Sequence, residues 1–116
     1  MISENFPVAG AGPVRMRELV LLAFDREITA KAAHAEATRQ GLREPSWEDA
    51  LQFGVQHPDV QRERPIVFLH EPWVGYFGRR DVIVLWDNAG RRELGLDGFD
   101  DPFPARYWFA FVRPPG

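Results

Sequence analysis

The alternation of apolar and polar positions divides the chain into one strand, two helices and then a series of strands. Residues 14–24 (VRMRELVLLAF) are apolar at every second position and become apolar on both sides in their second half. This pattern is typical of a strand that enters the core. Residues 65–70 (PIVFLH) and 105–113 (ARYWFAFVR) are almost continuously apolar and predict two further buried strands, the second of which closes the chain.

An Ala-rich segment between the first two of these strands has a helical pattern. Thr29 is a good N-cap, and Gly41 stands where a helix ends with a residue in the left-handed region. We therefore expect a helix over residues 30–40. The side chains on its apolar face are mostly methyl groups, so it can lie close against a sheet.

The stretch GLREPSWEDALQFG (41–54) marks either a reactive serine or the start of a second helix. The sequence places no histidine to activate Ser46 as a nucleophile. Ser46 and Asp49 instead have the spacing of a capping box, in which each side chain accepts a hydrogen bond from the backbone of the other. The apolar positions of this helix follow the spacing of one stripe, which we expect to face the core: Trp47, Leu51, Gly54 and Val55.

The chain after residue 70 has the pattern of hairpins. Residues 73–87 (WVGYFGRRDVIVLWD) predict two strands joined by a turn, and DNAG (87–90) predicts a second turn. Residues 91–99 (RRELGLDGF) predict another strand, whose inward side carries Leu94 and Leu96.

This order of elements, helices followed by strands, predicts an α+β fold with a mostly antiparallel sheet. Two helices flank the sheet, and pairing of the N-terminal and C-terminal strands would bury both of these apolar segments. We expect a single domain over residues 14–116. Residues 1–13 contain PVAGAGP and are expected to be a flexible N-terminal segment.

Segments 24–69, 91–101 and 106–113 together resemble, in their order and spacing, a family of small bacterial proteins from metagenomic and candidate-phylum genomes. Members of that family carry the pattern PxLQRxFPIVALGS followed by GxRxLxLxWFD and RFLAVR. The family has no assigned activity, so this resemblance implies none.

A second resemblance concerns the fold. GLREPSWEDALQF (41–53) is similar to the RLPTEAEWEYA segment of formylglycine-generating-enzyme-like domains, and FAFVR (109–113) is similar to the strand that closes them. The resemblance implies a C-type-lectin-like fold. Glu44 stands where that family has Leu, and the chain has no cysteine for the copper-binding thiolates of that enzyme. The resemblance therefore implies the fold without the activity.

The composition excludes several classes of functional site and predicts where the protein is located. The chain has 116 residues, no cysteine and a net charge of −3, from 17 acidic and 14 basic residues. Thiolate metal sites and thiol catalysis are excluded, and a clustered basic face for nucleic acid is not indicated. The sequence has neither a long apolar run nor a signal-peptide pattern, so we expect a cytoplasmic protein that does not span a membrane. We expect no metal and no cofactor.

Two chemical alternatives remain open beside a binding function. His70 and Glu71 are adjacent and could form an acid–base pair in a small polar pocket. Glu71-Pro72-Trp73 and Trp86-Asp87-Asn88 faintly resemble the calcium-ligand segments of sugar-binding C-type lectins, which would make the domain a calcium-dependent carbohydrate binder.

Aromatic and arginine residues of the later loops form the strongest candidate site. Trp and Tyr are preferred contact residues at protein interfaces, and loops carry function more often than cores do. We expect a non-enzymatic module that binds another protein through a looped, aromatic face rimmed by arginines: Trp73, Tyr76, Phe77, Arg79, Arg80, Arg91, Arg92, Phe99 and Phe103.

Overall fold

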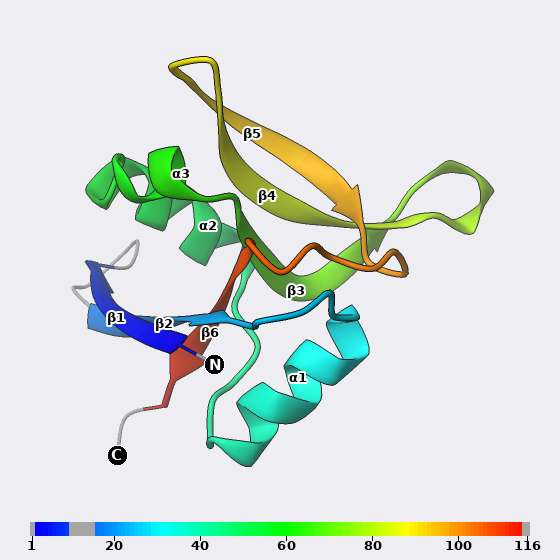
Figure 1. Ribbon diagram of the computed structural model, residues 1–116, viewed down its shortest axis with the longest axis horizontal. Helices are drawn as coiled ribbons and strands as arrows, with labels where there is room; N and C mark the ends of the chain where they lie inside the picture. The colour runs from blue at the N-terminus through cyan, green and yellow to red at the C-terminus, as the bar shows by residue number, and fades with distance from the viewer. Residues whose placement is uncertain (1, 10–15, 115–116) are drawn as a thin grey trace.

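The computed structural model describes residues 2–9 and 16–114, and it has the α+β architecture that the order of elements predicts (Figure 1). Six strands form one sheet, and three short helices pack on it. In chain order the elements are β1 (Ile2–Ala9), β2 (Met16–Ala23), α1 (Ala30–Arg39), α2 (Trp47–Gln56), α3 (Val60–Glu63), β3 (Ile66–Val74), the 3₁₀ turn η1 (Tyr76–Gly78), β4 (Arg80–Asn88), β5 (Arg91–Gly98) and β6 (Trp108–Arg113).

The strands lie in the order β1-β2-β6-β3-β4-β5. β2 pairs antiparallel with β6, which confirms the predicted pairing of the early strand in residues 14–24 with the strand that closes the chain. β6 and β3 are parallel, and the other neighbouring pairs are antiparallel. β1 and β5 are the two edges of the described sheet.

Both faces of the sheet are covered, because α1 lies on one side and α2 with α3 on the other (Figure 1). On the α1 side, three alanines of the helix let it approach the strands closely. Thr29 caps this helix as predicted, since its hydroxyl oxygen accepts from the backbone N–H of Ala32 at 3.2 Å. The backbone of Gly41 has φ of +77°, the left-handed conformation expected after the helix end.

On the α2 side, Ala50 and Phe53 pack on buried residues of the central strands. The predicted capping box is present: Ser46 Oγ accepts from the N–H of Asp49 at 3.2 Å, and Asp49 Oδ2 accepts from the N–H of Ser46 at 2.8 Å. Asp49 also forms an ion pair with Arg17 of β2 at 3.2 Å, which offsets the burial of its carboxylate. Ser46 is therefore the start of a helix.

The expectation of a flexible segment over residues 1–13 is wrong for Ile2–Ala9, which form β1 along β2. Its side chains contribute to the α2-side core: Phe6 meets the ring of Phe53 edge-on with centroids 5.4 Å apart, and Val8 is buried. His57 Nε2 donates to the carbonyl of Pro7 at 2.8 Å. β1 is an edge strand, where a proline such as Pro7 is tolerated. Met1 and residues 10–13 lie outside the described residues.

The two hairpins differ in their turns. β4 and β5 are joined by Ala89 and Gly90, whose φ values of 52° and 90° are those of a hairpin turn with two positive φ angles. The predicted turn at residues 87–90 is thus present, with Ala89 in the position that Asn occupies more easily. β3 and β4 are joined through η1, where Phe77 has φ of 60°.

Candidate functional site

The apolar stripe of α2 faces outward, which corrects the prediction that it is buried. Trp47, Leu51 and Val55 are 43%, 42% and 76% exposed, while Ala50 and Phe53 on the adjacent side of the helix are buried. The helix thus has two apolar sides, and the sheet covers only one of them. Gly54 lies between the two, and a side chain added there would meet Leu85 of β4 at 3.4 Å.

Trp73 of β3 extends this exposed apolar area. The register of β3 and β4 shifts between Phe68 and Trp73, and beyond the shift Trp73 pairs with Asp81. Residues directly opposite each other point to the same side of a sheet, which places Trp73 on the α2 side. Its ring lies 6.5 Å from that of Trp47, between centroids.

β5 brings two leucines to the same side. Leu94 pairs with Leu85 and Leu96 with Ile83, and both partners belong to the α2-side core. Leu94 and Leu96 therefore also point to the α2 side, but at the open edge of the sheet they stay 48% exposed. They do not complete the core as the sequence predicted. We call the exposed apolar side chains on this side the α2–β5 surface: Trp47, Leu51, Val55, Trp73, Leu94 and Leu96.

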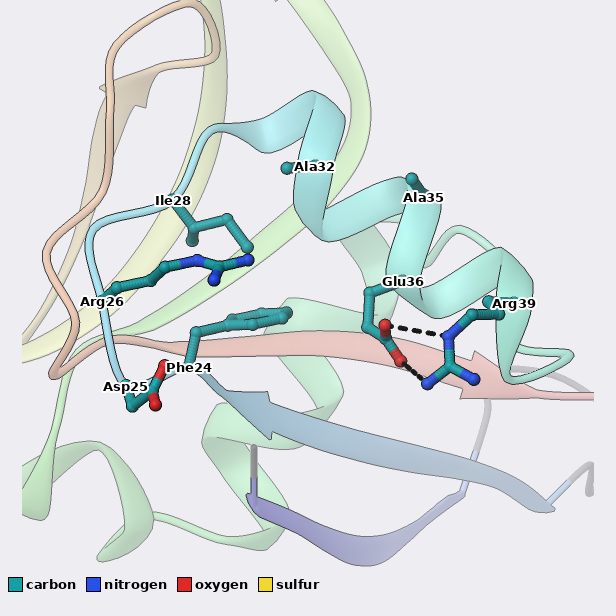
Figure 2. Close-up of a pocket in the computed structure, with 8 residues that line it drawn as sticks. All are labelled: Phe24, Asp25, Arg26, Ile28, Ala32, Ala35, Glu36 and Arg39. Carbon is teal, nitrogen blue, oxygen red and sulfur yellow. Dashed lines mark hydrogen bonds and ion pairs between the residues drawn. The ribbon is translucent and has the colours of Figure 1, made fainter.

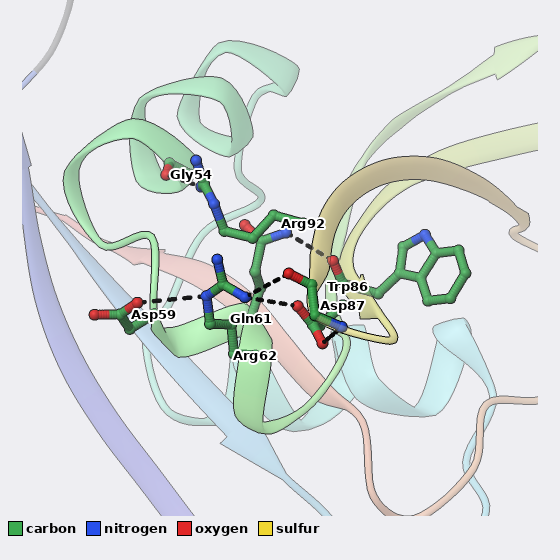
Figure 3. Close-up of polar contacts among 8 residues, drawn as sticks. Gly54, Asp59, Gln61, Arg62, Trp86, Asp87 and Arg92 are labelled. Carbon is green, nitrogen blue, oxygen red and sulfur yellow. Dashed lines mark hydrogen bonds and ion pairs between the residues drawn. The ribbon is translucent and has the colours of Figure 1, made fainter.

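Polar contacts fix the hairpin of β4 and β5 against the helices (Figure 3). Arg92 reaches from β5 to α2, where its Nη1 donates to the carbonyl of Gly54 at 2.9 Å. The amide of Gln61, buried in α3, donates to the carbonyls of Trp86 and Glu93 at 2.8 and 3.3 Å. These contacts satisfy backbone oxygens from three elements at once, so α2 and β5 are held in one arrangement.

Arg62 adds a second link between α3 and the hairpin (Figure 3). Its Nη1 donates to Asp87 at 3.1 Å and to the carbonyl of Gly90 at 3.0 Å, and its Nε lies 3.5 Å from Asp59. Asp87 in turn accepts from the N–H of Gly90 at 3.0 Å. Asp87 therefore orders the turn between β4 and β5.

His70 is a structural residue of the irregular part of β3. It is 2% exposed, and its Nε2 accepts from the backbone N–H of Ile83 at 3.0 Å. Its Nδ1 therefore carries the proton and donates to the carbonyl of Glu71 at 2.7 Å. Both ring nitrogens are used by the backbone, and the Glu71 side chain is exposed. This geometry is against the acid–base pair, because no nitrogen of His70 is free to exchange a proton with a substrate.

The other predicted site residues do not form one face. Phe103 is 2% exposed and belongs to the α1-side core. Arg80 pairs with Asp100, and its guanidinium lies over the ring of Phe99, 4.7 Å from the centroid. Phe99 in turn packs against the α1-side core.

The hairpin tip and the far end of the hairpin hold the remaining predicted residues. Phe77 is fully exposed at the tip, and Arg79 nearby forms an ion pair with Asp81 at 2.6 Å. The side chain of Tyr76 lies outside the described part of the structure. Arg91 and Arg92 stand at the opposite end of β4 from Arg80. With eight residue steps along β4 this separation is about 27 Å.

The two segments proposed for calcium are also apart. Glu71 lies near the end of β4 that holds Asp81, whereas Asp87 lies near its other end and is engaged by Arg62. Within residues 2–9 and 16–114, no group of three or more His, Asp or Glu side chains is placed to hold a metal ion. The structure therefore gives the calcium alternative no ligand cluster among these residues.

A pocket of about 460 Å³ lies on the α1 side, between α1 and the segment that follows β2 (Figure 2). Phe24, Ile28 and two alanines supply its apolar lining. Glu36 and Arg39 close one end and neutralise each other, and the hydrogen bond from Arg39 lowers the pKa of Glu36. The lining holds two carboxylates, Asp25 and Glu36, and no serine or histidine, and the Glu36 carboxylate is already engaged by Arg39.

The sequence missed five of the six residues of the α2–β5 surface. Spacing alone placed Trp47, Leu51 and Val55 in the core, and alternation alone placed Leu94 and Leu96 there. A signal was present in α2, because Ala50 and Phe53 form a second apolar set that competes for the core. Of the nine residues that the sequence predicted for binding, only Trp73 lies in this surface.

None of the helices in the described part of the chain is long and apolar enough to span a membrane. Comparison of the chain with protein-family models gives no match, and comparisons with the curated proteins and with the solved structures give none either.

Proposed function

We propose that the protein is a non-enzymatic binding module that recognises another protein through the α2–β5 surface. One observation carries the proposal: large apolar side chains from three separate segments gather, exposed, on one side of the sheet beside its open edge. Contiguous apolar areas on a protein surface mark interaction sites, and tryptophan is the residue most enriched where binding energy concentrates. Trp47 and Trp73 provide two such side chains.

The partner segment that fits this place is an extended strand. The N–H of Phe99 donates to the carbonyl of Arg80 at 2.8 Å, so odd-numbered residues of β5 direct their backbone groups toward β4. Because the direction alternates along a strand, the N–H and C=O groups of Arg92, Leu94 and Leu96 point away from β4, beyond the open edge of the sheet. An added strand would pair with these groups and place its alternate side chains beside the two leucines, the mode of recognition called β-augmentation.

We also propose that the domain is a variant of the C-type-lectin-like fold. The antiparallel pair of β2 and β6 and the helices α1 and α2 between β2 and β3 support this proposal. The sequence predicted that another protein binds on a looped, aromatic face. The binding site proposed here shares Trp73 with that face and otherwise lies on α2 and β5.

A displayed library of random peptides, selected on the immobilised protein, tests the binding function with no need for an identified partner. We expect the selected peptides to carry alternating apolar residues. Their affinity should fall at least tenfold, about 1.4 kcal/mol, on Trp73→Ser and on Leu94→Ser. Val74→Ser is the matched control, because Val74 is the neighbouring residue in β3 and is 70% exposed. Equal losses in Trp73→Ser and Val74→Ser, or no loss in either, would refute the proposed surface.

A further inference from the structure

We propose that the strand added to β5 is β5 of a second copy of the same chain, related by a two-fold axis, so that two six-stranded sheets become one continuous sheet. The inference rests on the proposed function and names the partner. It requires an open edge, and β5 provides one: its eight residues pair with β4 in uninterrupted register and contain no proline. The opposite edge, β1, contains Pro7, which cannot donate a hydrogen bond from its backbone.

The backbone of β5 restricts how two copies can pair. Its even-numbered residues direct their N–H and C=O groups outward, so only even-numbered residues can exchange hydrogen bonds across the new interface. A two-fold axis makes the arrangement antiparallel and identical in both directions. In each allowed register, one residue of β5 lies on the axis opposite the same residue of the second copy. Shifting this central residue by one position gives the next register.

Charge selects one of these registers. When Leu94 stands opposite Leu94 of the second copy, Arg91 stands opposite Asp97, and the symmetry repeats this pair at the other end. Within the described ranges, the side chains of Arg91 and Asp97 form no hydrogen bond and no close ion pair, and the charge of Arg79 acts on Asp97 without such a contact. Asp97 is partly buried, and this burial raises its pKa. Since Arg91 faces Asp97 twice, this register gains two ion pairs across the interface.

The two neighbouring registers bring like charges together. Centring the pair on Gly95 places Glu93 opposite Asp97, and centring it on Glu93 places two copies of Glu93 opposite each other. Like charges directly opposite in a sheet are destabilising. In the register centred on Leu94, Glu93 instead faces Gly95, beside which Trp86 Nε1 lies, 3.3 Å from where a Cβ would be. Gly95 thus places no charge opposite Glu93.

The same register joins the two α2–β5 surfaces. Leu94 meets its own symmetry mate on the α2 side, and Leu96 comes opposite Arg92, whose guanidinium is held by Gly54 on α2. The half-exposed leucines of both copies would then form one apolar strip across the dimer. A second copy would thus pair with the outward backbone groups, place Arg91 against Asp97 and cover the exposed leucines.

Sedimentation velocity across a concentration series tests the proposal. We expect the wild-type chain to dimerise, and Arg91→Asp or Asp97→Arg to weaken the dimer at least tenfold, because each change creates two like-charge pairs. The double variant Arg91→Asp/Asp97→Arg should restore the dimer. Arg26→Asp is the matched control, since Arg26 is an exposed arginine on the α1 side without a hydrogen bond or ion pair to a described residue. It should leave the dimer unchanged.

Leu94→Pro provides a second variant, which removes the outward N–H without removing a bond to β4. It should abolish the dimer, whereas Leu94→Ser, which keeps the N–H, should only weaken it.

A wild-type chain that stays monomeric at millimolar concentration, or a double charge swap that does not restore a lost dimer, would overturn the proposal. A monomer that still binds the selected peptides through Trp73 overturns the dimer alone. A chain that neither dimerises nor binds them overturns the proposed function as well.

Discussion

Replacement of His70 should destabilise the fold through a single backbone group, the N–H of Ile83. His70→Phe keeps an aromatic ring of similar size beside Trp73, whose ring centroid lies 4.9 Å away, but removes both nitrogens. The N–H of Ile83 then loses its acceptor in a place that water does not reach, since Ile83 is 2% exposed. The carbonyl of Glu71 loses its donor as well, but Glu71 is exposed and can turn to solvent.

The magnitude follows from these contacts. A buried backbone donor without a partner costs about 1–3 kcal/mol, which we expect for His70→Phe. His70→Ala also removes the ring and leaves a cavity, so the loss rises to about 3–5 kcal/mol. His70→Gln keeps an acceptor within reach of the N–H of Ile83 and should lose about 1 kcal/mol or less. A domain of this size has about 5–15 kcal/mol in total, so His70→Ala approaches the limit of stability.

Urea denaturation measures the order of these losses, and amide hydrogen exchange identifies their source. The exchange rate of the Ile83 amide should rise more than that of Val84 in His70→Phe and should stay near the wild-type rate in His70→Gln. Glu71→Gln is the control, since its side chain is exposed and its stability should change by less than about 0.5 kcal/mol. If His70→Phe and His70→Gln are equally stable, or if Ile83 remains protected in both, the hydrogen bond does not hold this strand and the argument fails.

Three further changes test other parts of the fold. Asp49→Ala removes both the capping box and the partner of Arg17, and urea denaturation should show a loss of about 1–2 kcal/mol, against a few tenths for Glu48→Ala in the same turn. Ala89→Asn should raise the thermal midpoint through a gain of about 0.5–1 kcal/mol, because Asn accepts the positive φ of 52° more easily; Ala89→Val should lower it. Burial lowers the pKa of His34 from its ordinary value of 6.5, so the unfolded chain binds the proton more tightly. Stability should therefore fall as the pH drops below 6.5 toward the folded pKa, and His34→Gln should flatten urea midpoints measured between neutral and mildly acidic pH.

Features that depend on a few neighbouring residues could be predicted from the sequence. The Thr29 cap and the capping box of Ser46 and Asp49 follow from side chains that reach backbone groups three residues away. The turn after β4 follows from the cost of positive φ. The pairing of β2 with β6 could also be predicted, because burying two nearly continuous apolar segments requires neighbours on both sides.

Features that depend on distant residues could not be predicted. β1 contains Pro7 and a polar run at residues 3–5, and it becomes a strand because Phe6 and Val8 pack against Phe53 and β2. Phe103 lies between prolines in a segment that the sequence assigns to a loop, yet its backbone pairs with that of Ile28 and its ring enters the core. In each case a partner that decides the outcome lies far away along the chain, Phe53 for Phe6 and Ile28 for Phe103.

α2 shows why the same pattern can predict a fold and conceal a binding surface. Its ten residues carry apolar side chains at positions 47, 50, 51, 53 and 55, an arc wider than one face of a sheet can cover. Helical spacing is satisfied whether positions 47, 51 and 55 or positions 50 and 53 face the core. Positions 50 and 53 face the core because Phe53 packs on Phe68, with ring centroids 5.9 Å apart, and because Gly54 lets the helix approach Leu85. The rest of the arc stays at the surface beside the open edge of β5. A helix that is more apolar than its core contact requires, placed next to an unpaired strand, is therefore the reason why we propose a second surface for another chain.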